Sequence, residues 1–349
     1  MKMVNNRFHA CATCVNFKAE KEEANLKYFC ARLGFETRTH YQFDCWDPKE
    51  NVKKLMAANN LKNRGVISLQ YNVETHWLKE NLEDKNVRVV DCRFKLGDPD
   101  AGRIQYENSH IPGAVYFDLE KDLSGAVEVH GGRHPLPKSS HLKARLEEAG
   151  IDKETIIVAY DEKEGAFASR FWWLLKYLGH DKVYILSGGY EAWTKAQNPV
   201  DEVIPQYRKA EFNISETPDM LASYDEVKDI ALNGKEDTIL IDSREINRYL
   251  GIEEPIDRIA GHIPSAINKP WMEGLENGYF KSKEEQEMRF AGLDKDQPII
   301  VYCGSGVTAT PNFIALKEAG FKHVRLYAGS YSDWVSYEGN PVGKGKEGS

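Results

Sequence analysis

Residues 87–93 read Val-Arg-Val-Val-Asp-Cys-Arg, and residues 238–244 read Thr-Ile-Leu-Ile-Asp-Ser-Arg. Each stretch is a short run rich in branched apolar side chains that ends in Asp-x-Arg. A run of this kind predicts a strand buried inside a sheet, with its polar residues at the carboxyl end. The recurrence of one pattern at two distant places predicts an internal repeat.

The repeat extends over most of the chain. Three further pairs of segments match in the same order: 110–114 with 262–266 (His-Ile-Pro-[Gly/Ser]-Ala), 156–161 with 299–303 (a buried strand that ends at a turn), and 188–193 with 329–334 (Gly-x-Tyr-x-x-Trp). The offset between matched segments varies little, so the copies differ only by insertions in loops. One domain has therefore been duplicated.

Within each copy, apolar strands alternate with amphipathic segments that predict helices, for example over 142–149, 168–178 and 307–319. Gly150, Gly179 and Gly320 directly follow these segments, as a glycine at a helix C-terminus does. This alternation predicts an α/β fold, in which each copy has a central parallel sheet flanked by helices.

The repeat divides the chain into three parts. We predict one α/β domain over residues 66–205 and a second over 215–345, joined by a polar linker near 204–218. Residues 1–65 do not match either copy and form a separate module that is rich in cysteine. The total of 349 residues agrees with two domains and a small addition.

Composition excludes several classes of function. With 41% hydrophobic and 29% charged residues, the chain is typical of a globular protein. A formal charge of -8 at pH 7 argues against a nucleic-acid-binding surface, which needs a basic patch. No stretch is apolar enough to span a membrane, and the N-terminus lacks the apolar run of a secretory signal, so we expect a cytoplasmic protein.

One cysteine, Cys303, stands apart from the others at the end of a predicted buried strand. The loop 303–308 (Cys-Gly-Ser-Gly-Val-Thr) follows this strand and leads into a helix. Glycines let such a loop curl so that successive N–H groups point at one anion, and the helix N-terminus adds partial positive charge. Both effects favour a reactive thiolate. The alternative is a buried structural cysteine.

Two reactions use a cysteine in such a loop. A cysteine-dependent phosphatase needs an arginine six positions after the nucleophile to bind phosphate, and Ala309 occupies that position. The phosphatase hypothesis fails for this reason. Sulfur transfer remains, in which the thiolate attacks the outer sulfur of a donor and the loop N–H groups stabilise the resulting persulfide.

These repeated motifs, taken together, resemble the two-domain rhodanese family over roughly residues 66–345. The resemblance implies two similar domains, each with a central five-stranded parallel sheet, and an active site of the second domain at their interface. It implies that Cys303 accepts the sulfur, and that the first domain, with Asp161 at the matching position, is inactive. It also implies catalysis without a cofactor.

The loop bears on the sulfur donor as well. In the thiosulfate branch of the family the nucleophile is usually followed by Arg-Lys-Gly-Val-Thr, whereas the loop of this chain resembles the 3-mercaptopyruvate branch. We therefore expect 3-mercaptopyruvate as the donor, with thiosulfate as the alternative. The residues expected to bind the donor are Arg170, Gly304, Ser305, Gly306, Val307 and Thr308.

Two interpretations are possible for Arg170, for the repeated histidines and for residues 128–137. Arg170 resembles the family's arginine that reaches the cleft between the domains, although a surface salt bridge would also explain it. His110 and its repeat partner His262 are expected to hold their loops rather than to line the cleft. Residues 128–137 (Glu-Val-His-Gly-Gly-Arg-His-Pro-Leu-Pro) have no counterpart in the second copy, and they form either a loop that crosses toward the active site or a solvated connector.

The first 65 residues contain four thiols, at Cys11, Cys14, Cys30 and Cys45. The spacing Cys11-x-x-Cys14 fits two ligands on one turn, and four thiolates around zinc would let so short a segment fold. We predict a zinc site formed by these four residues. The alternatives are a redox-active Cys11–Cys14 pair, an iron–sulfur cluster, and thiols that relay sulfur from Cys303.

The sequence thus predicts a sulfurtransferase that works through a Cys303 persulfide. Its partners are a small-molecule sulfur donor and a thiol acceptor, such as thioredoxin or a low-molecular-weight thiol, with cyanide as an acceptor in vitro. Neither nucleic acid nor a membrane is expected as a partner. The rival hypothesis is a non-catalytic binding or regulatory scaffold, and the intact loop after Cys303 argues against it.

Overall fold

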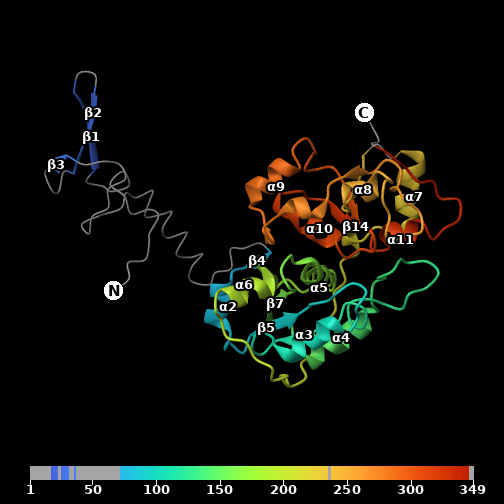
Figure 1. Ribbon diagram of the computed structural model, residues 1–349, viewed down its shortest axis with the longest axis horizontal. Helices are drawn as coiled ribbons and strands as arrows, with labels where there is room; N and C mark the ends of the chain where they lie inside the picture. The colour runs from blue at the N-terminus through green and yellow to red at the C-terminus, as the bar shows by residue number, and fades with distance from the viewer. Residues whose placement is uncertain (1–16, 23–24, 31–34, 37–70, 235–236, 346–349) are drawn as a thin grey trace. The chain divides into compact units, whose positions relative to one another are not determined.

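A computed structural model describes residues 17–22, 25–30, 35–36, 71–234 and 237–345, shown in colour in Figure 1. The chain divides into two compact units, residues 1–68 and 69–349. In the first unit, the described strands form an antiparallel sheet in the order β1-β2-β3: β1 (Phe17–Glu22), β2 (Asn25–Cys30) and β3 (Phe35–Glu36). The second unit contains both copies of the repeat.

The first copy has a five-stranded sheet in the order β4-β8-β7-β5-β6, and every pairing in it is parallel. Its strands are β4 (Asn72–Val73), β5 (Val87–Asp91), β6 (Val115–Tyr116), β7 (Ile156–Tyr160) and β8 (Val183–Leu186). Its helices are α2 (Thr75–Asn81), α3 (Ala101–Asn108), α4 (Ser139–Glu148), α5 (Ala166–Tyr177) and α6 (Gly189–Lys195). All five residues of β5 are buried, as the opening sequence pattern predicts.

The second copy has a parallel sheet in the order β10-β9-β13-β14. Its strands are β9 (Ile239–Asp242), β10 (Ile267–Asn268), β13 (Ile299–Tyr302) and β14 (Val324–Leu326), and a hairpin of β11 (Leu275–Glu276) and β12 (Tyr279–Phe280) lies outside this sheet. Its helices are α7 (Tyr224–Asn233), α8 (Ile246–Tyr249), α9 (Lys283–Arg289), α10 (Ala309–Glu318) and α11 (Ser330–Trp334), with 3₁₀ turns η2 (Pro218–Met220) and η3 (Trp271–Gly274).

The second sheet differs from the expected five strands. At the edge where β4 pairs with β8 in the first copy, the second copy has a single parallel bridge between Leu221 and Leu326. The chain before this bridge forms the 3₁₀ turn η2, which begins with Pro218. A proline has no N–H to donate and favours a turn, so the extended segment that follows is too short to count as a strand.

The predicted helix ends agree with the structure. Gly150, Gly179 and Gly320 follow α4, α5 and α10 with φ angles of 68°, 84° and 89°. This left-handed conformation is the one that ends a helix and that glycine adopts without strain. Residues 202–217, which cover most of the predicted linker, contain no helix or strand.

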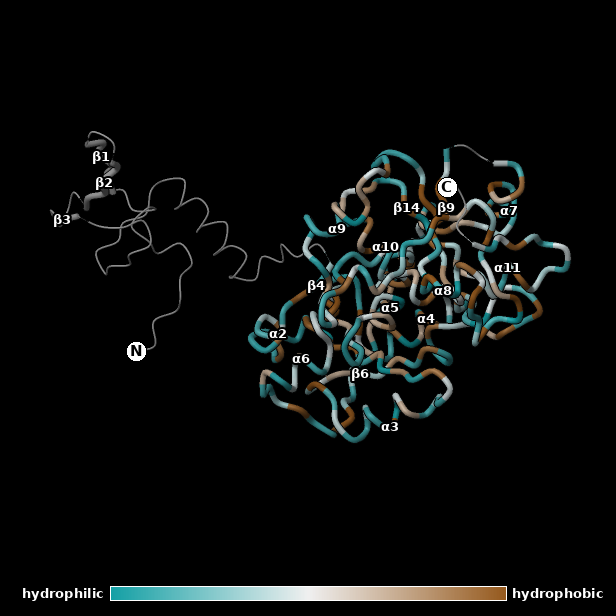
Figure 2. The backbone as a smooth tube through the Cα atoms, turned by 45° about the horizontal axis from the view of Figure 1, so that its top comes forward, coloured by the Kyte–Doolittle hydropathy of each residue, from teal (hydrophilic) through white to brown (hydrophobic). Residues whose placement is uncertain are grey.

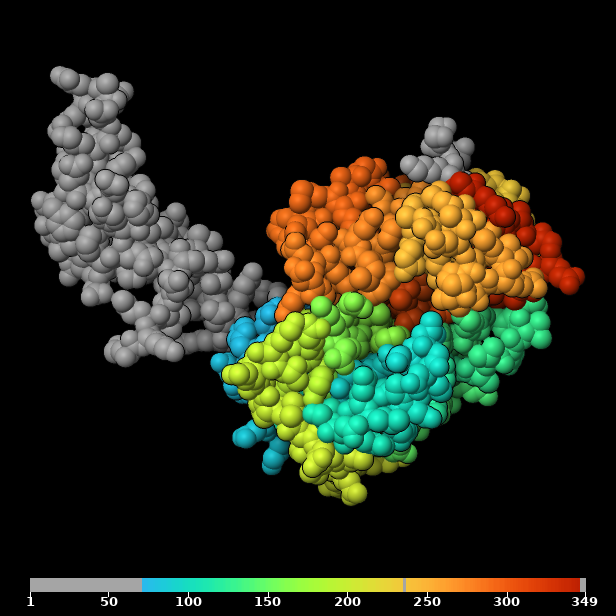
Figure 3. Space-filling view, in the orientation of Figure 1, coloured from blue at the N-terminus to red at the C-terminus, as the bar shows by residue number. Residues whose placement is uncertain are grey.

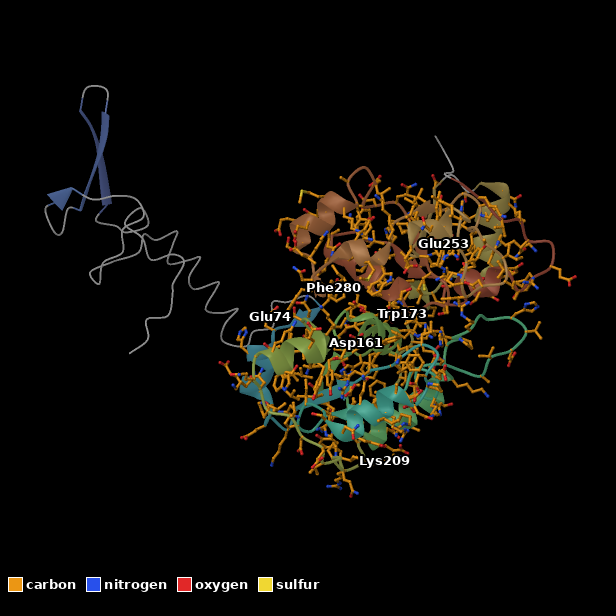
Figure 4. All side chains as sticks on the ribbon, in the orientation of Figure 1. Glu74, Asp161, Trp173, Lys209, Glu253 and Phe280 are labelled. Atoms are coloured by element: carbon orange, nitrogen blue, oxygen red, sulfur yellow. The ribbon has the colours of Figure 1, made fainter. Side chains whose placement is uncertain are left out.

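The two copies pack directly on each other within the second unit (Figure 3). One hydrophobic cluster contains buried residues of both copies. At its centre Trp172 and Trp173 of α5 lie against Phe313 of α10, with ring centroids 6.4 Å apart in both pairs. In Figure 4, Trp173 lies where the elements of the two copies meet. The start of α10, and with it the loop after β13, is therefore held beside the first copy.

The sheets are apolar through the interior of this unit. In Figure 2 the tube is brown along β9, whose last three residues are buried, and teal in many surface loops. The central strands β7 and β13 carry almost continuous buried apolar runs, as expected for parallel sheets covered on both faces. Polar residues begin where these strands end, at Asp161 and Cys303.

Candidate active site

Cys303 lies at the carboxyl end of β13, one residue after Tyr302, and α10 begins at Ala309. Its side chain is buried, and its sulfur accepts a hydrogen bond from the N–H of Gly306 at 3.2 Å. The N–H groups of Ser305, Val307 and Thr308 donate no hydrogen bond to any described residue. These amides are available to an anion bound at the sulfur, as the strand–loop–helix pattern predicts.

Gly306 is required by the shape of this loop. Its φ is 77°, and a side chain there would collide with the carbonyl oxygen of Ala328. Both the left-handed backbone and the close approach of a neighbouring peptide exclude larger residues. The sharp turn at Gly306 brings its N–H back to the sulfur of Cys303.

Two guanidinium groups converge on the residue after the nucleophile. A Cβ atom added at Gly304 would lie 2.9 Å from Nη2 of Arg133, and 3.4 Å and 3.7 Å from Nη2 and Nη1 of Arg248. Arg133 comes from the first copy, within residues 128–137, and Arg248 comes from α8 of the second. Arg133 and Arg248 are therefore the two described cations that lie beside Gly304.

Arg248 was not among the site residues predicted from the sequence. It lies four residues after Arg244 of the second Asp-x-Arg motif, on the short helix that follows β9. A cation placed just past the carboxyl end of a central strand is brought to the edge of the sheet where Cys303 lies. That position was the signal by which it could have been found.

Arg248 and Arg133 belong to a chain of alternating charges, in which they are the two arginines farthest from the core of the second copy. The six side chains, in order from the core of the second copy to the first copy, are Asp242, Arg244, Glu254, Arg248, Asp257 and Arg133. The acids in this chain are all buried. Asp257 bridges the two outer arginines, because one of its oxygens pairs with Arg133 and the other accepts from Nη2 of Arg248 at 2.9 Å.

Residues 128–137, here called the strap, cross from the first copy onto the second (Figure 1). The N–H of Gly131 donates to Asp333 at 2.7 Å, and the N–H of Arg133 donates to Ser332 at 3.1 Å. The ring of His130 stacks on Tyr337 with centroids 3.8 Å apart. Of the two alternatives that the sequence left open, the structure favours a loop that crosses to the Cys303 loop.

The strap also contacts the loop through His134, whose Nδ1 lies 2.9 Å from Oγ of Ser305. Burial, together with the positive charges of Arg170 and Arg133, lowers the pKa of His134 to about 4. The imidazole is therefore neutral at physiological pH. It fixes the hydroxyl of Ser305 without adding a charge beside Cys303.

Arg170, the cation predicted to bind the donor, contacts backbone carbonyl groups around the Cys303 loop. Its side chain is fully buried, and its guanidinium donates to the carbonyl oxygens of Gly306 at 3.2 Å, Leu123 at 3.3 Å, His134 at 3.1 Å and Pro135 at 3.4 Å. Burial lowers the pKa of Arg170 to about 10, so it remains charged. Arg170 ties the strap and the Cys303 loop to α5.

Two of the other predicted loop residues, Val307 and Thr308, make local hydrogen bonds or none. The carbonyl of Val307 accepts hydrogen bonds from the N–H and the hydroxyl of Thr310, at 3.1 Å and 2.7 Å. Thr308 is the residue that precedes α10, and its side chain makes no capping hydrogen bond. The side chain of Val307 is buried in the hydrophobic cluster shared by the two copies, so both residues offer N–H groups rather than polar side chains to the loop.

Asp161 occupies the position of Cys303 in the first copy, and its carboxylate fills the matching cradle. It accepts hydrogen bonds from the N–H groups of Lys163, Gly165, Phe167 and Ala168, at 2.9 Å to 3.3 Å. The first copy thus holds its own anion where the second offers amides to a bound one. This agrees with the absence of a nucleophile there.

The repeated Asp-x-Arg and His residues of both copies hold the fold together. Arg93 pairs with Asp91 and donates to the carbonyl of Ser109, just as Arg244 pairs with Asp242 and donates to Gly261. The two ring nitrogens of His110 contact the carbonyl oxygens of Tyr106 and Val203, as expected for a histidine that holds its loop in place. These groups lie in the core and do not reach the sulfur.

Replacing Asp161 with Asn is expected to change how stability depends on pH. Burial raises the pKa of Asp161 to about 6, although its four N–H partners oppose this. The folded state then binds a proton that the unfolded state releases, so this group adds stability as pH falls from 6 toward 4. Relative to D161N, the wild type should gain about 2 kcal/mol in unfolding free energy between pH 7 and pH 4.5.

Urea unfolding of both proteins at the two pH values measures this difference, and all other titrating groups cancel in the comparison. An equal change in the two proteins, or a larger loss in the wild type on acidification, would show that Asp161 has no raised pKa.

The cysteines predicted to bind zinc are not placed by the structure. Cys11, Cys14 and Cys45 lie outside the described residues, and only the backbone of Cys30 is described, at the end of β2. The described part of the chain contains no group of three or more His, Cys, Asp or Glu side chains that could hold a metal. It also contains no helix long and apolar enough to cross a membrane.

Known proteins share this fold and this order of motifs. A family model described as a rhodanese-like domain matches residues 74–196 and again 223–337. A probable 3-mercaptopyruvate sulfurtransferase of Pseudomonas aeruginosa is 40% identical over 274 residues, which is 77% of this chain and 96% of that protein. A thiosulfate sulfurtransferase of Rattus norvegicus is 33% identical, over 75% of this chain and 91% of that protein.

Among solved structures, a 3-mercaptopyruvate sulfotransferase of Escherichia coli with the rhodanese fold has a TM-score of 0.67 and is 32% identical in sequence. The match covers 75% of this chain and 99% of that one. The likeness therefore extends over both copies of the repeat.

Proposed function

The chain belongs to the rhodanese family, in two tandem copies of its domain, and on this basis we propose that it transfers sulfur from 3-mercaptopyruvate to a thiol through a persulfide on Cys303. The observation that supports this most is the loop after β13. There the sulfur accepts a hydrogen bond from Gly306, three more N–H groups of the same loop have no acceptor among the described residues, and two arginines lie beside Gly304.

In the first step, the thiolate of Cys303 attacks the thiol sulfur of the donor. A sulfur–sulfur bond forms, the carbon–sulfur bond of the donor breaks, and its electron pair leaves on the carbon of a pyruvate enolate. The persulfide proton then moves to this carbon, which gives pyruvate and a persulfide anion. No external proton, oxidant or reductant is needed, so the step balances.

The loop supplies what this step requires. The persulfide anion is stabilised by the N–H of Gly306 and by the free N–H groups of the loop. The hydroxyl of Ser305 relays the proton from the persulfide to the enolate carbon, and the neutral ring of His134 holds it in place. The positive charges of Arg133 and Arg248 attract the carboxylate of the donor to the position beside Gly304.

In the second step, the thiolate of an acceptor attacks the outer sulfur. The sulfur leaves on the acceptor as a new persulfide, and Cys303 returns to its thiolate. Thioredoxin and low-molecular-weight thiols fit this step, and cyanide would leave as thiocyanate. Catalysis by these residues uses no cofactor.

The donor assignment is tested by turnover of 3-mercaptopyruvate and of thiosulfate by the same preparation in one buffer. We expect kcat/KM for 3-mercaptopyruvate to exceed that for thiosulfate by at least about tenfold, because paired guanidinium groups suit a planar carboxylate. Mass spectrometry of the protein after incubation with donor should show one added sulfur on Cys303.

A thiosulfate kcat/KM well above the mercaptopyruvate value would reverse the donor assignment and leave thiosulfate:cyanide sulfur transfer as the function. Absence of added sulfur with both donors would end the enzyme hypothesis in favour of a binding scaffold.

Several finer assignments stay predictions of the sequence. We propose the domain limits 66–205 and 215–345, a cytoplasmic location, and a zinc site formed by Cys11, Cys14, Cys30 and Cys45. Their support is the repeat, the composition and the cysteine spacing, respectively.

A further inference from the structure

We propose that Arg133, which the first copy contributes through the strap, is the residue that makes Cys303 select a carboxylate donor. This inference rests on the proposed function and deepens it, because it assigns the choice of donor to one side chain. That side chain lies outside the catalytic domain and outside the Cys303 loop.

The first argument is the hydrogen-bonding capacity of the two arginines. Arg248 uses Nε and Nη2 on Glu254 and Asp257, at 2.8 Å to 3.2 Å, and its side chain is 12% exposed. Arg133 pairs with Asp257 through Nη1, and its side chain is 32% exposed. Among the described residues, nothing accepts a hydrogen bond from its Nε or Nη2.

Nε and Nη2 lie on the same edge of a guanidinium, and this edge donates two parallel hydrogen bonds to a carboxylate. Nη2 is also the atom of Arg133 that lies 2.9 Å from the Cβ position at Gly304. The free edge of Arg133 is therefore next to the nucleophile. Arg248, whose matching edge is occupied by acids, supplies charge and holds Asp257.

The second argument is steric. Arg133 lies where a side chain on residue 304 would begin, and Gly304 has an ordinary φ, so the glycine is needed for space and not for backbone conformation. A loop with a larger residue at this position would carry its own group beside the sulfur. In this chain the loop carries none, and the cation reaches the same place from the other copy.

The third argument is that Arg133 is fixed. Its own N–H donates to Ser332, the N–H of Gly131 donates to Asp333, and Asp257 holds its Nη1. The strap thus contacts the second copy on both sides of Arg133, through Gly131 before it and through His134, which contacts Ser305, after it. A guanidinium positioned in this way recognises the planar shape of a carboxylate as well as its charge.

The experiment is a set of variants assayed with both donors. In Arg133→Met we expect kcat/KM for 3-mercaptopyruvate to fall roughly 30-fold, mainly through KM, and that for thiosulfate to fall less than about threefold. Arg133→Lys keeps the charge without the planar edge and should recover only part of the loss. Arg103→Met, an exposed arginine on α3 of the same copy, is the matched control and should leave both donors unchanged.

Gly304→Ala tests the steric argument by pushing Nη2 of Arg133 away with a single methyl group. It should cause a similar loss with 3-mercaptopyruvate in the wild type and little further loss in Arg133→Met. Such non-additivity shows that both changes act on one subsite. Added sulfur on Cys303 of each variant, measured by mass spectrometry with thiosulfate, shows that the loop is still folded.

Equal losses with both donors in Arg133→Met, or fully additive effects with Gly304→Ala, would overturn the inference. So would unchanged kinetics in Arg133→Met. A wild-type protein that acquires no sulfur from either donor would instead overturn the proposed function. That result is distinct, because it is read on Cys303 without any change at Arg133.

Discussion

Replacement of Cys303 with serine should lower kcat/KM for either donor by at least about a thousandfold, because the reaction passes through a bond that only sulfur can form. A serine hydroxyl in the same place stays protonated at neutral pH and cannot accept the donor sulfur. The loop, the guanidinium groups and the strap remain in this variant. Steady-state turnover measures the loss, and mass spectrometry should find no added sulfur.

Cys92 provides a matched control for this change. It is a buried free thiol that directly follows β5 in the first copy, whereas Cys303 follows β13 in the second. Burial raises the pKa of Cys92 well above its usual range, so it stays a neutral thiol. Cys92→Ser should keep the wild-type rate, and sulfur found on Cys92 or activity left in Cys303→Ser would contradict the assignment.

Replacement of Arg244 with methionine should lower the free energy of unfolding by about 3–5 kcal/mol. Arg244 holds Asp242 by hydrogen bonds of 2.7 Å to 3.2 Å, and both side chains are almost fully buried. Without the arginine, the carboxylate of Asp242 is left charged and unpaired inside the protein. The cost comes from this stranded charge and exceeds what the ion pair contributes when intact.

The first copy offers the matched variant, Arg93→Met, which strands Asp91 in the same way. Both variants should lose similar stability in urea unfolding, but their activities should differ. Arg244 also pairs with Glu254, which holds Arg248 at the active site. Among the described residues, Arg93 pairs with no acid other than Asp91. If the free energy of unfolding falls by less than about 1 kcal/mol in both variants, these two ion pairs do not hold the fold together.

The sequence predicted what depends on local pattern. The duplicated strands, the glycine helix ends and the turn from β13 into α10 are each written in a few consecutive residues, so periodicity and residue type identify them. The strap was also recognisable, because an insertion in one copy alone suggests a use that the other copy lacks. Asp161 and Cys303 could likewise be matched to each other, because each directly follows the same buried strand of its copy.

The partners of the arginines could not be predicted. Arg170 and Arg133 both lie in segments that point to the cleft, and no local rule says that one would be surrounded by carbonyl oxygens while the other keeps a free edge. That outcome depends on how α5, the strap and the Cys303 loop pack across the two copies. Arg248 was missed although it lies just past a central strand, because its place beside Gly304 depends on Asp257 and on Arg133 of the other copy.

The strap makes the second copy depend on the first for part of its active site. Its partners Ser305, Ser332 and Asp333 all belong to the second copy, whereas the strap itself is part of the first. A second copy expressed without the first would therefore keep Cys303 and its loop but lack Arg133 and His134. The first copy, whose own cradle is closed by Asp161, thus supplies side chains to its neighbour.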